Sequence, residues 1–192
     1  MPNHHRALFM SDLHMGGRHF DLDRLAHFFK NRTADRLYLV GDILEGMSRV
    51  AGRAIEVLES VAPSVSYIYG NHDFLRAING WTSVDHVFHD TADGKRLLVT
   101  HGDKFDPLMN GWRVIFHALP AAVLSRFVHQ QFVVAAKETA ISQGCSGVIC
   151  GHLHHPEIHH EGGFLYINTG DFVANCTAIA EDGDGHFTLL YG

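Results

Sequence analysis

The sequence predicts an α/β fold in which two sheets pack face to face and helices cover them on the outside. Three observations lead to this prediction: strands and helices alternate at the start of the chain, hairpin patterns dominate its later part, and one helical segment lies between them. Strands connected by helices form parallel sheets, whereas strands connected by short turns pair antiparallel. With 192 residues the chain can bury a substantial core, and we expect a single domain over residues 1–192.

The first part of the chain reads as strand, helix, strand, helix, strand. Apolar runs rich in Val, Ile, Leu, Tyr and Phe occupy 6–10, 36–40 and 65–69, as strands buried on both faces require. Between them, 21–29 and 46–62 carry apolar residues at helical spacing. This βαβαβ order indicates a parallel sheet.

Antiparallel pairs are predicted in the later part, because glycine-containing turns separate short apolar runs there. Further buried runs at 96–99 and 147–150 have the composition of core strands. Together these segments predict a second sheet. The turns are Asp93-Gly94 within 85–102, Gly162-Gly163 within 157–170, and Gly183-Asp184-Gly185 within 176–192.

The segment 106–143 is predicted to be a helical insertion with two helices that meet at Pro120. Its apolar stripe is wider than one buried helix face needs. The stripe either packs on the sheet or forms a lid with an apolar groove for a lipid-like substrate. In the second case Phe116 contacts substrate, and Arg113 and Arg126 approach a phosphate or lipid headgroup; otherwise both arginines face solvent.

Charge and composition narrow the range of partners and compartments. The net charge is −6, from 15 Lys and Arg against 21 Asp and Glu, without any basic run, so we expect no nucleic-acid partner. The three cysteines are too few for a disulfide framework and suit a reducing cytoplasm. The N-terminal segment lacks the apolar core of a signal peptide, and no window is apolar enough for a membrane span. We therefore expect a cytoplasmic protein, either soluble or peripheral at a membrane.

Asp, Asn and His side chains, which commonly bind metal ions, follow the predicted strands on short loops. The C-terminal ends of neighbouring strands converge on one crevice in layered α/β folds, so we expect these side chains to meet. The candidates are Asp12 and His14 in SDLH, Asp42 in VGDILE, Asn71 and His72 in YGNHD, His101 in THGD, and His152 and His154 in GHLHH.

Each of these loops also has an ordinary explanation when taken alone. Asp12 and His14 are separated by one residue, so on an extended segment both side chains point the same way and can hold one cation, but Asp-x-His is common. Asp42 follows a glycine, where a carboxylate can bridge two ions or cap a helix. Asn71 and His72 belong to an Asn-His-Asp sequence of the kind often found in turns.

Asp, Asn and His without thiolate ligands favour Mn²⁺, Fe or Zn²⁺ at a hydrolytic site over a structural zinc site. The number of donors implies two ions. Two divalent ions roughly 3.5–4 Å apart can orient a phosphorus centre and stabilise both its attacking and its leaving oxygens. His155 extends the last motif by one residue, and alternation points it away from its neighbour, so we do not expect it to be a metal ligand.

In their order along the chain, these residues resemble the motif series of the calcineurin-like metallophosphoesterase superfamily: D-x-H, G-D-x-x-[DE], G-N-H-[DE], H and G-H-x-H. The resemblance spans nearly the whole chain and implies a four-layer α/β/β/α sandwich of two mixed sheets flanked by helices. It also implies a dinuclear centre, with Mn²⁺ as the preferred ion. By motif, Asp12, His14, Asp42 and His154 hold one ion, and Asp42, Asn71, His101 and His152 hold the other, with Asp42 as the bridge.

The same resemblance assigns roles to two further residues. In the family the histidine at the position of His72 lies near the phosphate, where it protonates the leaving oxygen or stabilises transition-state charge. Glu45 occupies the acidic position of G-D-x-x-[DE] and either orients that imidazole or is an exposed glutamate at a helix start. Gly70 and Gly151 fit a close approach of the backbone beside the metals.

Within the superfamily the sequence is most similar to the UDP-2,3-diacylglucosamine diphosphatase group, through SDLHMG, THGDKFD, the helical segment that follows it, and YINTGDFV with CTA. Members cleave the pyrophosphate of a nucleotide-linked diacyl sugar in lipid A synthesis, so the resemblance predicts a lipid-linked phosphate substrate. The group has arginine at the position of His72 and a longer insertion. The alternatives are a phosphodiesterase or phosphatase for a small soluble nucleotide, and a non-catalytic scaffold, which the complete set of ligands disfavours.

Overall fold

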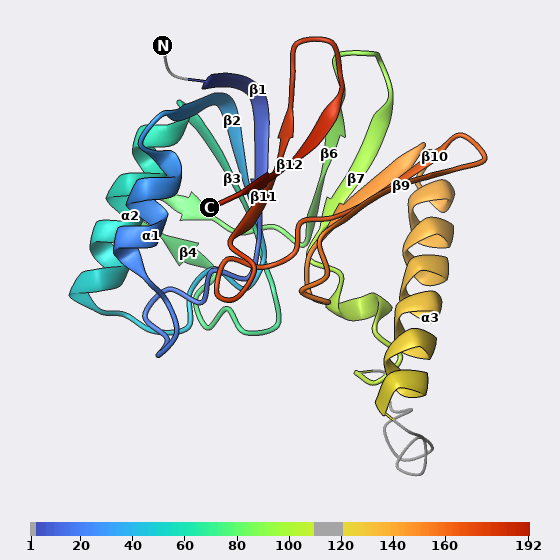
Figure 1. Cartoon of the computed structure of the whole chain (residues 1–192), viewed down its shortest axis with the longest axis horizontal. Helices are drawn as coiled ribbons and strands as arrows, with labels where there is room; N and C mark the ends of the chain where they lie inside the picture. Colours follow the sequence, from blue (N-terminus) through green and yellow to red (C-terminus); the bar gives the residue numbers. More distant parts are fainter. Residues whose placement is uncertain (1–2, 110–120) are drawn as a thin grey trace.

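The computed structural model describes residues 3–109 and 121–192. Two five-stranded sheets lie face to face (Figure 1). The helices α1 (Leu22–Phe29) and α2 (Arg49–Val61) cover the outer face of one sheet, and α3 (Ala121–Ser142) covers the outer face of the other. The layers therefore follow the α/β/β/α order, and the predicted fold class is confirmed.

The first sheet combines the predicted parallel opening with the last hairpin. Its order is β12-β11-β1-β2-β3, in which β1, β2 and β3 run parallel and β11 runs antiparallel to β1 and β12. The register pairs Leu8 with Leu37 and Leu37 with Val65, so the C-terminal ends of the three parallel strands lie at one edge. The strands are β1 (Asn3–Met10), β2 (Arg32–Val40), β3 (Ser64–Ile68), β11 (Thr177–Glu181) and β12 (Phe187–Tyr191).

The second sheet has the order β6-β7-β8-β10-β9, with parallel central strands and antiparallel edge strands. The hairpins β6–β7 and β9–β10 are two of the three that the glycine-containing turns predict, and the third, β11–β12, joins the first sheet. A short ribbon of β4 and β5 was not predicted. The remaining elements are β4 (Ala77–Ile78), β5 (Trp81–Thr82), β6 (His86–Asp90), β7 (Arg96–Thr100), the 3-10 helix η1 (Asp103–Phe105), β8 (Gly147–Cys150), β9 (Glu157–Glu161) and β10 (Phe164–Asn168).

Local sequence signals set the start of α1 and both ends of α2. The Asp21 carboxylate accepts the backbone N–H groups of Asp23 at 2.9 Å and Arg24 at 3.1 Å, which satisfies two free donors of the first turn of α1. Ser48 caps α2 through its hydroxyl, and α2 ends before Pro63. Both α1 and α2 therefore have side-chain capping at their N-termini.

The core is divided into three apolar layers, because the side chains of each central strand alternate between its two faces. In β1, Leu8 and Met10 pack under α1 and α2, whereas Ala7 and Phe9 face the second sheet. The Phe9 ring stacks on Tyr38 with centroids 4.6 Å apart. Each fully buried large side chain contributes about 1.5–3 kcal/mol through removal from water, which fixes the strand register.

The helix α3 packs one face onto the second sheet. Phe132, Ala136 and Ala140 recur every four residues and are fully buried against Leu98 and Tyr166. The C-terminal half of the predicted insertion therefore has a packing role. Small alanines on this face let the helix lie close to the sheet.

Other apolar side chains of α3 remain in contact with solvent. Val123, Val134 and Ile141 are all exposed. The predicted substrate contacts Arg113 and Phe116, and the first of the two predicted helices, lie outside the described residues. Within the described ranges, no helix has both the length and the hydropathy that a bilayer span requires.

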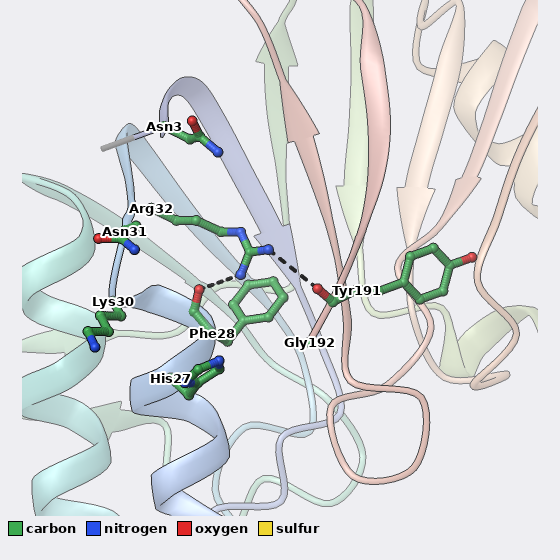
Figure 2. A pocket seen from close by; sticks show the side chains of 8 residues that line it. All are labelled: Asn3, His27, Phe28, Lys30, Asn31, Arg32, Tyr191 and Gly192. Atoms are coloured by element: carbon green, nitrogen blue, oxygen red, sulfur yellow. Dashed lines mark hydrogen bonds between the residues drawn. The ribbon is translucent and has the colours of Figure 1, made fainter. Parts of the chain in front are cut away.

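Arg32 connects three segments at the N-terminal end of the parallel strands (Figure 2). Its guanidinium donates to the carbonyl oxygens of Phe28 at 2.5 Å and Tyr191 at 3.4 Å, and it lies 4.3 Å from the centroid of the Phe28 ring. The adjacent hollow of about 310 Å³ includes Asn3 and Lys30. It lies at the opposite end of β1 and β2 from the predicted ligands, so it belongs to the packing of α1 and β12.

A buried charge cluster joins the two sheets. Glu181 of β11 is fully buried, and its Oε2 accepts a hydrogen bond from Arg6 of β1 at 2.7 Å and lies 2.7 Å from His89 Nε2 of β6. The backbone N–H of Ala92 donates to Oε1 at 2.8 Å, and the Tyr38 hydroxyl lies 3.0 Å from His89 Nδ1. Each polar or charged group of the cluster has a partner, so the cluster is compatible with burial. Removing one member would leave another buried without its partner and would destabilise the fold.

We predict that Glu181→Gln lowers the free energy of unfolding at neutral pH by roughly 2–3 kcal/mol, because Arg6 loses the buried charge that compensates it. Burial raises the pKa of Glu181, but His89, the Ala92 amide and Arg6 outweigh burial and hold this pKa below its ordinary value. Such a carboxylate stabilises the fold above its unfolded pKa of about 4.3, and this contribution is lost as the pH falls through the folded pKa. Urea unfolding across pH should show the difference between variant and wild type shrinking in acid.

The matched control is Glu161→Gln, which removes an exposed ion pair with Lys137. This variant should change stability much less, because solvent screens that pair. The difference in the free energy of unfolding between wild type and Glu181→Gln should depend on pH. If it stayed constant from neutral to acidic pH, the role given to the buried charge would be contradicted.

Candidate metal centre

The predicted ligand loops lie side by side at the C-terminal edge of the parallel strands. The backbone N–H groups of Asp12 and His14 donate to the carbonyl oxygens of Gly41 and Asp42, each at 3.0 Å. The N–H of Gly151 donates to His101 O at 2.9 Å. These bonds extend the pairing of the strands into the loops, so residues distant in sequence are held at fixed separations.

The backbone at the ligand positions is left-handed. Asp12, His14, Asp42, His152 and His154 all have φ between 50° and 67°, a region that L-residues other than Asn and Asp seldom enter. The expectation that Asp12 and His14 project together from an extended segment was therefore wrong. Even so, donor atoms of both side chains belong to one converging group.

Asp12, His14 and His154 form the first group of converging donors, with one atom from each lying within 4.8 Å of the others. The Asp12 carboxylate is completely buried, and its Oδ2 accepts from the Ser11 hydroxyl and the His152 backbone N–H. Its Oδ1 makes no hydrogen bond among the described residues, although His154 Nε2 lies 3.0 Å away. A buried carboxylate oxygen beside imidazole nitrogens is a donor arrangement that fits a divalent cation.

Asp12, Asp42 and His101 form a second, fully buried group. His101 Nδ1 donates to Val40 O at 3.0 Å, which directs Nε2 toward Asp42 Oδ2 at 3.3 Å. Burial raises the pKa of Asp42, but His101 and the His72 backbone N–H bring this pKa down to about 2. Burial lowers the pKa of His101, but Asp42 and Asp12 raise it to about 9. The pocket thus favours positive charge.

The remaining predicted ligands, Asn71 and His152, lie beside His101 of the second group. Asn71 is exposed, and its Oδ1 lies 3.2 Å from His101 Nε2. The His152 ring stands edge-on to the ring of His101, with centroids 5.3 Å apart. His152 Nε2 lies 3.0 Å from the Asp106 carboxylate, so a proton shared there leaves Nδ1 as the nitrogen with a free lone pair.

His72 and Glu45 lie beside the first group. His72 is exposed, and its ring lies edge-on to His14 with centroids 5.2 Å apart. Glu45 Oε2 lies 3.5 Å from His14 Nδ1, and one donor atom of His72 lies within 4.8 Å of both. Glu45 thus contacts His14, while its predicted action on His72 stays a prediction.

Two residues to which the sequence assigned no role in the site, Asp73 and Asp106, hold its loops in place. Asp73 is buried, and its two oxygens accept four backbone N–H groups at 2.8–3.0 Å, from Gly70, Asp42, Ile43 and Leu44. Asp106 holds the ring of His152. Both follow predicted ligands within the same motifs, GNHD and THGDKFD, but only the folded structure shows what their carboxylates contact.

Two of the predicted close backbone approaches are present. A Cβ on Gly70 would collide with the backbone nitrogen and carboxylate of Asp42, and a Cβ on Gly151 would collide with the side chains of Ser11 and Asp12. The two glycines therefore let neighbouring strand ends approach closely enough for the donors to meet.

An apolar groove of about 700 Å³ lies between the N-terminal half of α3 and the loop that carries His154. Leu108, Leu124 and Leu153 line its apolar part, and His154 of the first group is also in its lining. Arg126, one of the two arginines considered above, also lines it. The apolar groove that the sequence left as one of two possibilities is thus present beside the predicted metal ligands, while its use by a substrate stays a prediction.

The family of the chain follows from its sequence. The family model of the calcineurin-like phosphoesterase superfamily domain matches residues 6–181. The chain therefore belongs to the calcineurin-like phosphoesterase superfamily. Membership implies divalent metal ions, and together with the hydrolases to which the chain is similar it identifies a phosphoester hydrolase.

Curated relatives extend over most of the chain. The UDP-2,3-diacylglucosamine hydrolase of Neisseria meningitidis serogroup C is 25% identical over 93% of this chain and 95% of its own length. The enzyme of the same name from Shewanella loihica is 24% identical over 80% of this chain and 82% of its own length. These values support common ancestry along nearly the full length of both proteins.

Solved structures share the fold at lower identity. Vacuolar protein sorting 29 from Cryptosporidium parvum superposes with a TM-score of 0.62 at 13% identity, covering 97% of this chain and 95% of that one. An archaeal phosphodiesterase gives a TM-score of 0.57 at 18% identity, with 97% and 99% covered. Both likenesses concern the fold alone.

We predict that Asp106→Asn weakens binding of a divalent cation by about 10–100-fold, because the amide no longer holds His152 in the tautomer that frees Nδ1. Titration with Mn²⁺, followed by electron paramagnetic resonance of the free ion, measures the affinity without relying on turnover.

Asp103→Asn, three residues earlier on the same turn, is the matched control and should bind Mn²⁺ as wild type does. Equal affinities for wild type and Asp106→Asn would show that Asp106 does not position a ligand.

Proposed function

We propose that this protein is a metal-dependent hydrolase of a phosphodiester or pyrophosphate bond, with a UDP-2,3-diacylglucosamine-like molecule as its substrate. The observation that carries the proposal is the convergence of two groups of metal-binding side chains on the buried Asp12, next to an apolar groove. Donors of this type suit a dinuclear hydrolytic centre, and the groove suits acyl chains. Similarity to hydrolases named for that substrate supports the same conclusion.

In this proposal, one ion is held by Asp12, His14, Asp42 and His154, and the other by Asp42, Asn71, His101 and His152. We infer Mn²⁺ as the native ion, with Fe and Zn²⁺ as alternatives, because the donors are carboxylate, amide and imidazole groups. Asp42 is assigned as the bridge, although Asp12 is the carboxylate common to both donor groups. The two assignments make different predictions for metal binding.

The bound ions supply Lewis acidity at phosphorus and at the attacking water. The protein's own residues orient the substrate and manage protons. His72, exposed beside His14, is placed to protonate the leaving oxygen or to stabilise its charge. Glu45 would hold the neighbouring imidazole of His14 through its 3.5 Å contact.

The groove supports a lipid-linked substrate over a fully soluble one. Its leucines would cover acyl chains, while Arg126 would approach a phosphate or headgroup charge. Peripheral contact with the cytoplasmic side of a membrane belongs to the same proposal, because a molecule with acyl chains resides in a bilayer. Arg113 and Phe116 remain proposed substrate contacts. We keep a phosphodiesterase for small soluble nucleotides as the second candidate, because His72 stands where the diacylglucosamine group has arginine.

If Asp42 bridges both ions, Asp42→Asn should reduce affinity for both, because an amide offers only one oxygen to two positions. Asn71→Ala should release one ion only, since Asn71 is assigned to a single position. Metal content after equilibrium dialysis measures both effects. Two ions retained in Asp42→Asn would refute the bridge, and loss of both ions in Asp12→Asn alone would transfer that role to Asp12.

The test of substrate class compares hydrolysis of UDP-2,3-diacylglucosamine with that of bis(p-nitrophenyl) phosphate by the Mn²⁺-loaded protein. Leu124→Glu in the groove should lower kcat/KM for the lipid substrate by about tenfold or more and leave the generic diester unchanged. His72→Ala, with its metal content verified, should lower kcat for both substrates by about 100-fold or more.

Val134→Glu, on an exposed part of α3, controls for a new charge on this helix and should affect neither substrate. Turnover of the diester without the lipid would discard the substrate proposal and keep the hydrolase. Full activity of His72→Ala would remove His72 from the mechanism.

A further inference from the structure

A second set of metal-type side chains lies on the wall of the groove, outside both donor groups of the candidate metal centre. His129 comes from α3, His155 from the loop after β8, and Glu157 from the start of β9. One donor atom from each lies within 4.8 Å of the others. These three residues share no member with the two groups around Asp12.

The contacts within this set bring the three side chains toward one point. His129 Nε2 lies 3.0 Å from Glu157 Oε2. The rings of His129 and His155 stand edge-on, with centroids 5.5 Å apart and planes at 84°. His129 and Glu157 are partly buried, whereas His155 is exposed, so small side-chain rotations would bring all three donors to one ion.

We propose that His129, His155 and Glu157 form an additional Zn²⁺ site on the wall of the groove. Two imidazoles and one carboxylate are a known ligand set for zinc with a fourth, open position. Borderline-soft Zn²⁺ prefers imidazole more strongly than Mn²⁺ does, so the two kinds of site differ in metal preference. The open position would accept water or an anionic group of a molecule in the groove.

The location gives the ion a structural consequence. His129 is on the helix that forms one wall of the groove, whereas Glu157 and His155 belong to the second sheet and to the loop that carries His154. A shared ion would therefore fasten the N-terminal half of α3 to the edge of the second sheet. It would hold the groove at a fixed width beside the candidate metal centre.

The test compares Zn²⁺ content after equilibrium dialysis of the full chain with that of His129→Ala and Glu157→Gln. We expect each variant to bind one Zn²⁺ fewer than wild type, whatever number the Asp12 centre holds. Removing a direct ligand should weaken the additional site by more than the roughly 10–100-fold that loss of an outer partner costs. Co²⁺ substitution should give visible absorption of a tetrahedral ion that both variants lack.

His159→Ala is the matched control, because His159 is an exposed histidine on β9 that is not part of the set. This variant should bind as much Zn²⁺ as wild type. Amide exchange gives an independent readout: Zn²⁺ should slow exchange in the N-terminal half of α3 in wild type but not in His129→Ala. Equal Zn²⁺ content in wild type and both ligand variants would overturn the proposal.

Failure of this experiment and failure of the proposed hydrolase function are distinguishable. The additional site is read from metal content and from amide exchange in α3, whereas the hydrolase is read from turnover with Mn²⁺. A chain that hydrolyses its substrate but binds no extra Zn²⁺ would lose only the additional site.

Discussion

Left-handed backbone at the ends of the parallel strands is the constraint on which the candidate centre depends. Among the described residues, seven that are not glycine have a positive φ, and five of them are predicted ligands. Each such residue costs of the order of 1–3 kcal/mol unless its surroundings compensate. The hydrogen bonds between the Asp12 and Asp42 loops, and the four amides held by Asp73, supply that compensation. The fold itself therefore contributes to the geometry of the candidate ligands.

Contacts between the two sheets fix the position of the strand edge that carries the candidate centre. Apolar packing between them aligns β1 and β2 with β7 and β8, so that loops from both sheets reach the same pocket. The buried cluster around Glu181 connects the sheets on the far side and adds charge pairing to the apolar layer. Its cost of burial is met by several partners at once, which makes the relative position of the sheets specific.

Two different surface properties meet near the candidate metal centre: charge and an apolar hollow. Carboxylates stabilise positive charge at His101, while Leu108, Leu124 and Leu153 provide an apolar surface in the groove that His154 also lines. The proposed substrate, a phosphate with attached acyl chains, would complement both the positive charge and the apolar surface. The same helix carries His129, so the wall of the groove and the proposed zinc site share one element. Packing of α3 on the second sheet consequently bears on substrate shape as well as on stability.

The sequence by itself determined the order of strands and helices, the two-sheet class and the ligand loops, because period-two and helical patterns, turns and capping residues act over short distances. Tertiary structure alone decided the left-handed geometry at Asp12 and His154, and the partners of Asp73 and Asp106. It also decided that α3 buries Phe132 while leaving Val123 exposed. These features depend on contacts between residues far apart in the chain, and a linear pattern records the residue type but not the partner that it meets.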